Sequence, residues 1–251
     1  HKLALWASVA WGTLVWVVGE FVGGLLSPGA RWLNGAPGAV ALYVVGAAAL
    51  MAPWRSWTTG AVGSLLRRAA AAWFLLGAVL QAVPWEGSWT AAGISEPFAN
   101  GASTAQPLLF RVPISRVERW TAAQPTVTNA LLITVLVVVG TGLWLRADRF
   151  FIGGGIVFCA LTWWLAQDFG VLGGVATDPN SALPLGLLLI CSSPGWQERT
   201  AAERESLSMP SKPRVAQLLA PSAAALSALG IGALVVAPVF VAGLLLGPAD
   251  S

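Results

Sequence analysis

Residues 127–145 read VTNALLITVLVVVGTGLWL and contain no charged side chain. A helix needs about 20 mostly apolar residues to cross the hydrocarbon core of a bilayer. Inside hydrocarbon only helices and closed barrels can pair every backbone N–H and C=O, and barrel strands show alternating polarity. This stretch is apolar throughout, so it predicts a membrane-spanning helix.

Similar apolar stretches recur along the whole chain. We expect an all-α, polytopic transmembrane bundle forming a single integral membrane domain over residues 1–251. It would contain about seven spanning helices. Their predicted positions are roughly 3–26, 37–54, 66–83, 127–145, 150–167, 181–193 and 218–246. The sixth is the shortest, and the sequence leaves open whether it fully spans the bilayer.

Composition supports this fold class. Of the 251 residues, 56% are hydrophobic and only 10% are charged, whereas an ordinary soluble domain has about a quarter charged residues. Tryptophan occurs 14 times and tyrosine once. Many tryptophans lie near the ends of the apolar stretches, which is typical of an aromatic belt at the membrane interface. These are Trp32, Trp54, Trp57, Trp85, Trp89 and Trp120.

The positions of Lys and Arg predict the orientation. With the N-terminus in the cytoplasm, ten of the fourteen basic residues fall on the cytoplasmic side, as the positive-inside bias requires. We therefore expect a multi-pass plasma-membrane protein with a cytoplasmic N-terminus and an extracytoplasmic C-terminus. Residues 197–214 would form a cytoplasmic connector. Residues 84–125 would form an outer-face loop with an interfacial helix near 115–123, while Phe98 and 108–110 would dip toward the headgroups.

One pattern occurs twice. Gly19-Glu20-Phe21 is followed by a glycine pair, Asn34 and Pro37, and Gln167-Asp168-Phe169 is followed by a glycine pair, Asn180 and Pro184. The topology places both copies on helices that run outward, so helices 1–2 and 5–6 would be parallel repeats, a device known in transporters. A chance match remains open, because glycine and apolar residues are common throughout this chain.

Two acidic residues in the apolar stretches are candidate functional groups. An ionisable side chain at membrane depth is costly unless it is paired or hydrated. Glu20 and Asp168 could carry a proton or hold a cation. Alternatively, Glu20 could pair with Arg31 or with glycine-rich backbone and stabilise the fold, and Asp168 could face water at its helix end.

Polar residues of the expected outer face are further candidates. Glu86 lies between Trp85 and Trp89, where a cationic group could contact the ring faces, although an ordinary interfacial belt would have the same pattern. The outer loops also carry Asp178, Asn180 and Asn34. The first two belong to a turn-forming Asp-Pro-Asn sequence that could also offer oxygens to a hard cation.

The sequence argues against several kinds of site. The single histidine is His1, and Cys159 and Cys191 have no CxxC partner, so we expect no haem, copper or zinc site. The motifs GxxxxGK[ST], HExxH and GxSxG are absent. The basic residues are scattered and not interleaved with aromatics. We expect no cofactor or metal, and neither a nucleotide nor a nucleic acid partner.

Three classes of function remain. The scarcity of polar residues in the helices favours a non-catalytic subunit of a membrane assembly, with the lipid bilayer and other membrane proteins as partners. A small transporter or channel would use Glu20 and Asp168 in one cavity. A membrane enzyme acting on a lipid or quinone would use Glu20, Asp168 or Glu86 as acid or base at the outer interface. Because we favour the non-catalytic subunit, we do not expect the protein to be an enzyme.

Overall fold

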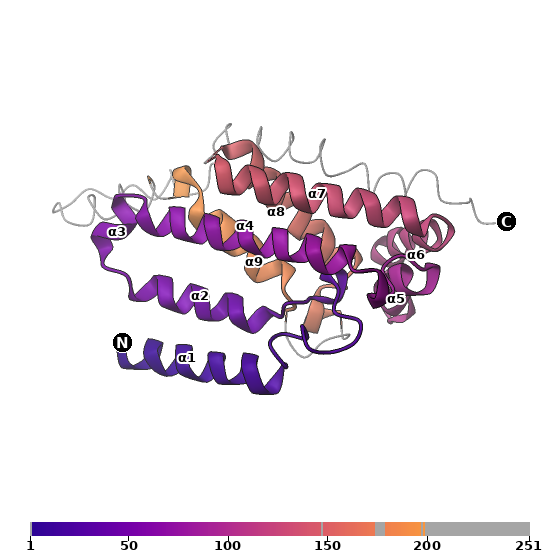
Figure 1. The fold of residues 1–251 in the computed structure, drawn as a ribbon, viewed down its shortest axis with the longest axis horizontal. Coiled ribbons are helices and arrows are strands. Elements are labelled where there is room, and N and C mark those ends of the chain that lie inside the picture. The colour runs from indigo at the N-terminus through magenta and orange to yellow at the C-terminus, as the bar shows by residue number, and fades with distance from the viewer. Residues whose placement is uncertain (1, 147, 174–178, 197, 199–251) are drawn as a thin grey trace.

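A computed structural model describes residues 2–146, 148–173, 179–196 and 198. Within these ranges the chain is helical and contains no strand, so the predicted all-α fold is confirmed for them (Figure 1). The predicted helix at 218–246 and the connector at 197–214 lie outside the described residues, apart from Glu198.

The helices follow one another with short connections. Helix α1 continues into a π-helical turn, η1, and three 3₁₀ turns lie between later helices. The bounds are α1 Lys2–Leu14, η1 Val15–Gly19, η2 Trp32–Asn34, α2 Ala39–Met51, α3 Trp54–Thr58, α4 Ala61–Ala82, η3 Pro84–Glu86, α5 Ala91–Ser103, α6 Leu108–Ala123, α7 Pro125–Leu145, α8 Arg149–Leu165, η4 Gly170–Leu172 and α9 Ala182–Ser192.

Four helical segments among the described residues are long and apolar enough to cross a membrane. They are Lys2–Gly19, Ala61–Ala82, Pro125–Leu145 and Arg149–Leu172. Helices α2 and α9 have 13 and 11 residues. At 1.5 Å per residue they are about 20 and 16 Å long, shorter than the roughly 30 Å hydrocarbon core. The chain is thus a membrane protein with transmembrane helices, and four of the seven predicted spans have the necessary length.

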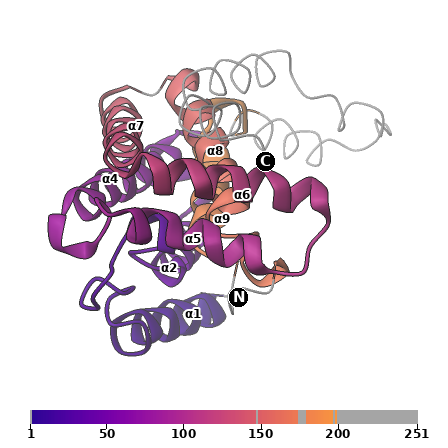
Figure 2. The same cartoon turned by 90° about the vertical axis from the view of Figure 1, so that its right-hand side faces the viewer.

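The long helices form a layered bundle. Helices α1, α2, α4 and α7 run side by side along the long axis, with α4 and α7 in the most extensive contact (Figure 1). Helices α5 and α6 pack on each other and lie across one end of the bundle (Figure 2). We call this the loop end, because the α1–α2 connection at residues 20–38 and the described parts of the α8–α9 connection also lie there.

Segment 84–125, predicted to form an outer-face loop, differs in detail from the prediction. It contains two helices, α5 and α6, where one short interfacial helix was expected. Phe98 is buried in the core rather than turned toward lipid headgroups. Leu108 and Leu109 are exposed, while Phe110 packs edge-on against Trp164.

The centre of the bundle is an aromatic cluster. Trp32, from the α1–α2 connection, stacks on Phe74 of α4 at 5.3 Å between ring centroids and lies 6.1 Å from Phe158 of α8. All three are fully buried. A Cβ at Gly77 would overlap the Trp32 ring, so that glycine admits the indole. The assignment of Trp32 to an interfacial belt was therefore wrong, because the 3₁₀ turn carries it into the core.

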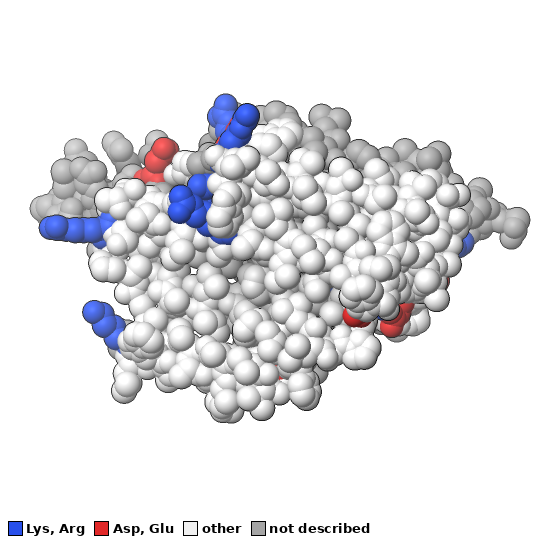
Figure 3. Space-filling model, viewed as in Figure 1, with Lys and Arg blue, Asp and Glu red and all other residues white. Residues whose placement is uncertain are grey.

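The opposite end of the molecule is basic. Figure 3 shows Lys and Arg side chains gathered toward the end that carries the N-terminus, α3 and the α7–α8 turn. The basic residues of these elements and of the start of α4 are Lys2, Arg55, Arg67, Arg68, Arg146 and Arg149. We call this the basic end.

Arg67 has a structural role at the basic end. Helix α4 begins at Ala61, five residues before the predicted start, which places Arg67 in its second turn. The guanidinium is buried and donates to the carbonyl oxygens of Leu143, Trp144 and Arg146. The last carbonyls of a helix have no partner within the helix. Arg67 thus caps the C-terminus of α7.

Candidate functional site at the loop end

In the first hairpin, formed by α1–η1 and α2, the first helix ends in backbone turns that are wider than an α-helical turn. The Glu20 amide donates to the Val15 carbonyl at 2.9 Å, and the Val22 amide donates to the Trp16 carbonyl at 2.8 Å. Phe21 and Val22 then adopt left-handed conformations, with φ of 49° and 60°. Such values are uncommon for side chains other than glycine, Asn and Asp, so this is a constrained segment.

A tryptophan connects this turn to the returning helix. The indole Nε1 of Trp16 donates to the Pro37 carbonyl at 2.8 Å. Gly23 lies against the same carbonyl, and a Cβ there would overlap it. The connection therefore passes close to the helix end, and Gly38, with φ of 86°, leads into α2.

The second hairpin, α8 and α9, has the same contacts. The Gln167 amide donates to the Thr162 carbonyl at 3.0 Å, and the Phe169 amide donates to the Trp163 carbonyl at 2.8 Å. Asp168 and Phe169 are left-handed, with φ of 43° and 57°. The Trp163 indole donates to the Pro179 carbonyl at 2.9 Å.

These contacts define which residues of the two hairpins correspond. Trp16 corresponds to Trp163, and Glu20 corresponds to Gln167. Asn180, with φ of 64°, occupies the place of Gly38 before the returning helix. The repeated sequence pattern matches Glu20 with Asp168 and Asn34 with Asn180. The geometry shifts the first match by one residue, so the two acids do not occupy corresponding positions.

Glu20 and Gln167 both lie beside the start of the returning helix. Gln167 is buried, and its Oε1 accepts from the Ala182 amide at 3.1 Å, while its Nε2 donates to Ser181 Oγ at 3.3 Å. The carboxylate of the half-buried Glu20 lies so close to the start of α2 that a Cβ on Gly38 would be 2.5 Å from Oε2. The carboxylate and the amide thus stand in equivalent places.

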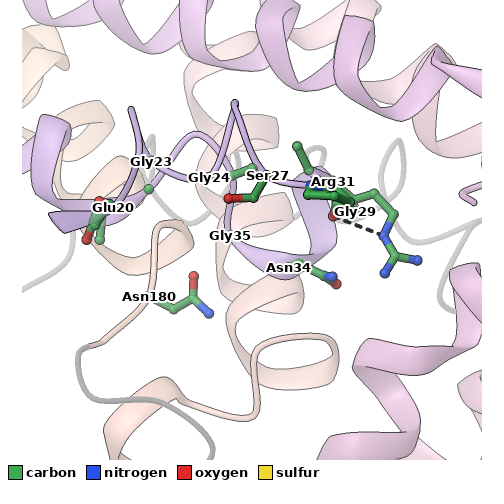
Figure 4. A pocket seen from close by; sticks show the side chains of 14 residues that line it. Glu20, Gly23, Gly24, Ser27, Gly29, Arg31, Asn34, Gly35 and Asn180 are labelled. Carbon is green, nitrogen blue, oxygen red and sulfur yellow. Dashed lines mark hydrogen bonds between the residues drawn. The ribbon is translucent and has the colours of Figure 1, made fainter. Parts of the chain in front are cut away.

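A cavity of about 310 Å³ opens between the two connections (Figure 4). Its polar side chains include Glu20, Ser27, Asn34 and Asn180, and the rest of the lining is largely glycine-rich backbone of the α1–α2 connection. Asn34 is exposed and Asn180 is half-buried. The Asn180 Oδ1 accepts from the Ser181 amide at 2.7 Å. The structure therefore brings three of the predicted candidates, Glu20, Asn34 and Asn180, to one pocket.

Arg31 lines the pocket but bonds to α5. Its guanidinium forms an ion pair with Glu96, donates to the Gly93 carbonyl, and donates to the Gly29 carbonyl at 3.4 Å. Figure 4 shows its guanidinium group directed away from Glu20. Arg31 therefore pairs with Glu96 and not, as the sequence had suggested, with Glu20. This ion pair attaches the α1–α2 connection to α5.

Glu86 contributes to the same attachment. Its carboxylate accepts a hydrogen bond from the Gly29 amide. The neighbouring Trp89 indole donates to the Ala82 carbonyl at 3.1 Å, and the Trp85 ring is largely exposed. These contacts give Glu86 a role in holding the α1–α2 connection.

Asp168 lies apart from the pocket lining. It is 1% exposed, so it does not face water. It accepts from Thr104 Oγ1 at 2.8 Å and from Gln106 Nε2 at 3.0 Å. Sequence reasoning missed Thr104 and Gln106, because nothing in the α5–α6 connection marks them as partners of a distant acid. Asp168 thus fastens that connection to the end of α8.

The described residues offer little for metal chemistry. Within them no group of three or more His, Cys, Asp or Glu side chains could hold a metal ion. Asp178, the remaining candidate, lies outside the described residues.

Comparison with protein-family models, with curated proteins and with solved structures finds no match to this chain.

Proposed function

We propose that the protein is a non-catalytic component of a membrane-protein assembly. The observation that carries this proposal is the aromatic cluster of Trp32, Phe74 and Phe158, which fills the centre of the described bundle with ring centroids 5.3–6.1 Å apart. A transport path needs polar groups or water along its length, whereas this centre is closely packed and apolar. The charged contacts instead hold elements together at the two ends.

The proposal includes a finer topology. The short helices α2 and α9 would each complete a crossing together with their buried connections, and 218–246 would supply the seventh span. Irregular backbone is tolerated at membrane depth where protein buries it, as it buries Trp32 and Leu33. The basic end would face the cytoplasm of a plasma membrane, with the N-terminus on that side and the C-terminus outside.

We also propose that the two hairpins are a parallel internal repeat. The paired Trp–Pro hydrogen bonds, the widened turns and the matching left-handed residues support it. Helices α1 and α8 would both run outward, and α2 and α9 would both return.

The transporter hypothesis has one observation in its favour. The two hairpin connections meet at the pocket that contains Glu20, as repeats do in many transporters. Asp168, one of the three candidate acids of the enzyme hypothesis, is buried and accepts hydrogen bonds from Thr104 and Gln106, which supports a structural role for it.

Native purification in mild detergent, followed by mass spectrometry of intact complexes, tests the main proposal. We expect a partner membrane protein at fixed stoichiometry. A monomer that carries only lipid after crosslinking in native membranes would contradict the subunit hypothesis. Substrate flux in proteoliposomes that disappears in Glu20→Gln would support transport instead.

Cysteine labelling tests the orientation. In a variant in which Cys159 and Cys191 are alanine, a cysteine replaces either Ser103 at the loop end or Thr58 at the basic end, both exposed. We expect a membrane-impermeant maleimide to label Ser103→Cys on intact cells, and Thr58→Cys only after the membrane is opened. The reverse pattern would invert the topology.

A further inference from the structure

Glu20 is a carboxylate at a position where the second hairpin has a neutral amide. Gln167 occupies the equivalent place in the second hairpin and holds the start of α9 with a neutral amide. A carboxylate is more costly than an amide at membrane depth. The difference between the hairpins at this position is therefore a negative charge, and in the first hairpin that charge lines a pocket.

The backbone around the pocket favours a positively charged ligand over an anion. Anion sites use backbone N–H groups that point at the ligand. Here the amides of the α1–α2 connection donate within the protein, which leaves few donors for an anion. The Gly29 amide donates to the Glu86 carboxylate. Four other amides donate to backbone carbonyls, namely Gly24 to Glu20, Ser27 to Gly24, Gly35 to Trp32 and Gly38 to Gly35.

The positive charge of Arg31 does not neutralise the negative charge of Glu20 in the pocket. Its ion pair with Glu96 already balances it, and the Gly93 and Gly29 carbonyls accept from its other nitrogens. The polar side chains that line the pocket include Glu20, Asn34 and Asn180, and the Asn180 Oδ1 also accepts from the Ser181 amide.

One carboxylate with neutral oxygens suits a monovalent cation. Calcium takes six to eight oxygen ligands, usually with several carboxylates. A primary ammonium group has one positive charge and three N–H donors, which suit a pocket with one carboxylate and neutral amide side chains. We propose that this pocket binds a primary ammonium group.

The surroundings indicate how such a group could arrive. Phe21 and Leu26, in the same connection, are 61% and 74% exposed. Acyl chains would contact these side chains if the ammonium belonged to a lipid headgroup such as ethanolamine. A free amine would offer the same chemistry without those contacts.

Lipid titration of the purified full chain in mild detergent, followed by native mass spectrometry, tests the proposal. The probes are phosphatidylethanolamine and phosphatidylcholine with identical acyl chains, since choline has no N–H donor. We expect the ethanolamine lipid to bind about tenfold more tightly or better, as for a charge-assisted hydrogen bond. Free ethanolamine that binds as tightly as the lipid would assign a soluble amine, whereas a much weaker affinity for free ethanolamine would assign the lipid.

Matched variants locate the site. Glu20→Gln should lose the preference for ethanolamine, whereas Glu118→Gln, an acid on α6 outside the pocket lining, should keep it. Equal binding of the two lipids by the wild type, or a preference that survives in Glu20→Gln, would overturn the proposal. Should Glu20→Gln fail to fold, Asn34→Ala tests the exposed side of the pocket. An unchanged preference in that variant would also overturn the proposal.

Discussion

Trp16 and Trp163 make the same hydrogen bond in two different hairpins. Each indole donates to a proline carbonyl in the connection that follows its helix, at 2.8 Å to Pro37 and 2.9 Å to Pro179. Each tryptophan carbonyl also accepts from the amide six residues later. One local solution thus reverses the chain twice at the loop end.

We expect Trp16→Phe and Trp163→Phe to destabilise the protein by similar amounts, about 1 kcal/mol each. That is the usual contribution of one hydrogen bond, and phenylalanine keeps most of the ring packing. Unfolding in mixed micelles measures the free energy. Trp6→Phe is the control, since Trp6 is 61% exposed. A large effect in only one hairpin would show that the two bonds are not equivalent.

Removing the cap on α7 should be more costly. Arg67→Ala leaves the last carbonyls of α7 without their donor, and we expect a loss of about 2–4 kcal/mol. The neighbouring Arg68 is exposed, so Arg68→Ala should change the free energy of unfolding by less than about 0.5 kcal/mol. Equal effects of the two substitutions would refute the capping role.

Asp168→Asn isolates the contribution of the carboxylate at the loop end. Asparagine tolerates the left-handed backbone found here, but it has one side-chain acceptor oxygen in place of two, so it cannot accept from both Thr104 and Gln106. We expect a loss of about 1–2 kcal/mol and faster amide exchange in the α5–α6 connection. Ser103→Ala, an exposed neighbour, should leave exchange there unchanged, and protection equal to wild type in Asp168→Asn would contradict the attachment.

Gly77→Ala should strain the aromatic core. The added methyl group would overlap the buried Trp32 ring, and overpacking of this kind costs about 1–3 kcal/mol. Gly46→Ala is the matched control, because a Cβ there meets only Leu188 at an ordinary 3.9 Å. The added strain should be relieved in the double variant with Trp32→Phe. If Gly77→Ala is as stable as Gly46→Ala, the indole does not occupy this space.

Apolar length predicted the long helices well. Residues 127–145 were expected to span and the helix runs from Pro125 to Leu145, while the predicted 150–167 compares with Arg149–Leu165. Both boundaries follow from local features, namely a proline at the first turn of α7 and an Asp148 side chain that accepts from the Phe150 amide.

The site could be predicted only in part. Charge in an apolar setting marked Glu20 and Asp168, but their different roles depend on contacts distant in sequence. The correspondence between the hairpins also needed the structure. The sequence pattern aligns Phe21 with Phe169, whereas the equivalent backbone hydrogen bonds are made by the amides of Val22 and Phe169. The burial of Trp32 could not be predicted either, because its neighbours Phe74 and Gly77 belong to α4 and are distant in sequence.

The exchange of Glu20 and Gln167 tests most directly whether the two positions are equivalent and whether the charge of Glu20 serves the pocket rather than the fold. We expect Glu20→Gln to unfold within about 0.5 kcal/mol of wild type, because an amide serves this position in the second hairpin. Gln167→Glu should lose about 2–4 kcal/mol, since it buries a charge and removes the donor to Ser181. A strongly destabilised Glu20→Gln beside a stable Gln167→Glu would contradict this account.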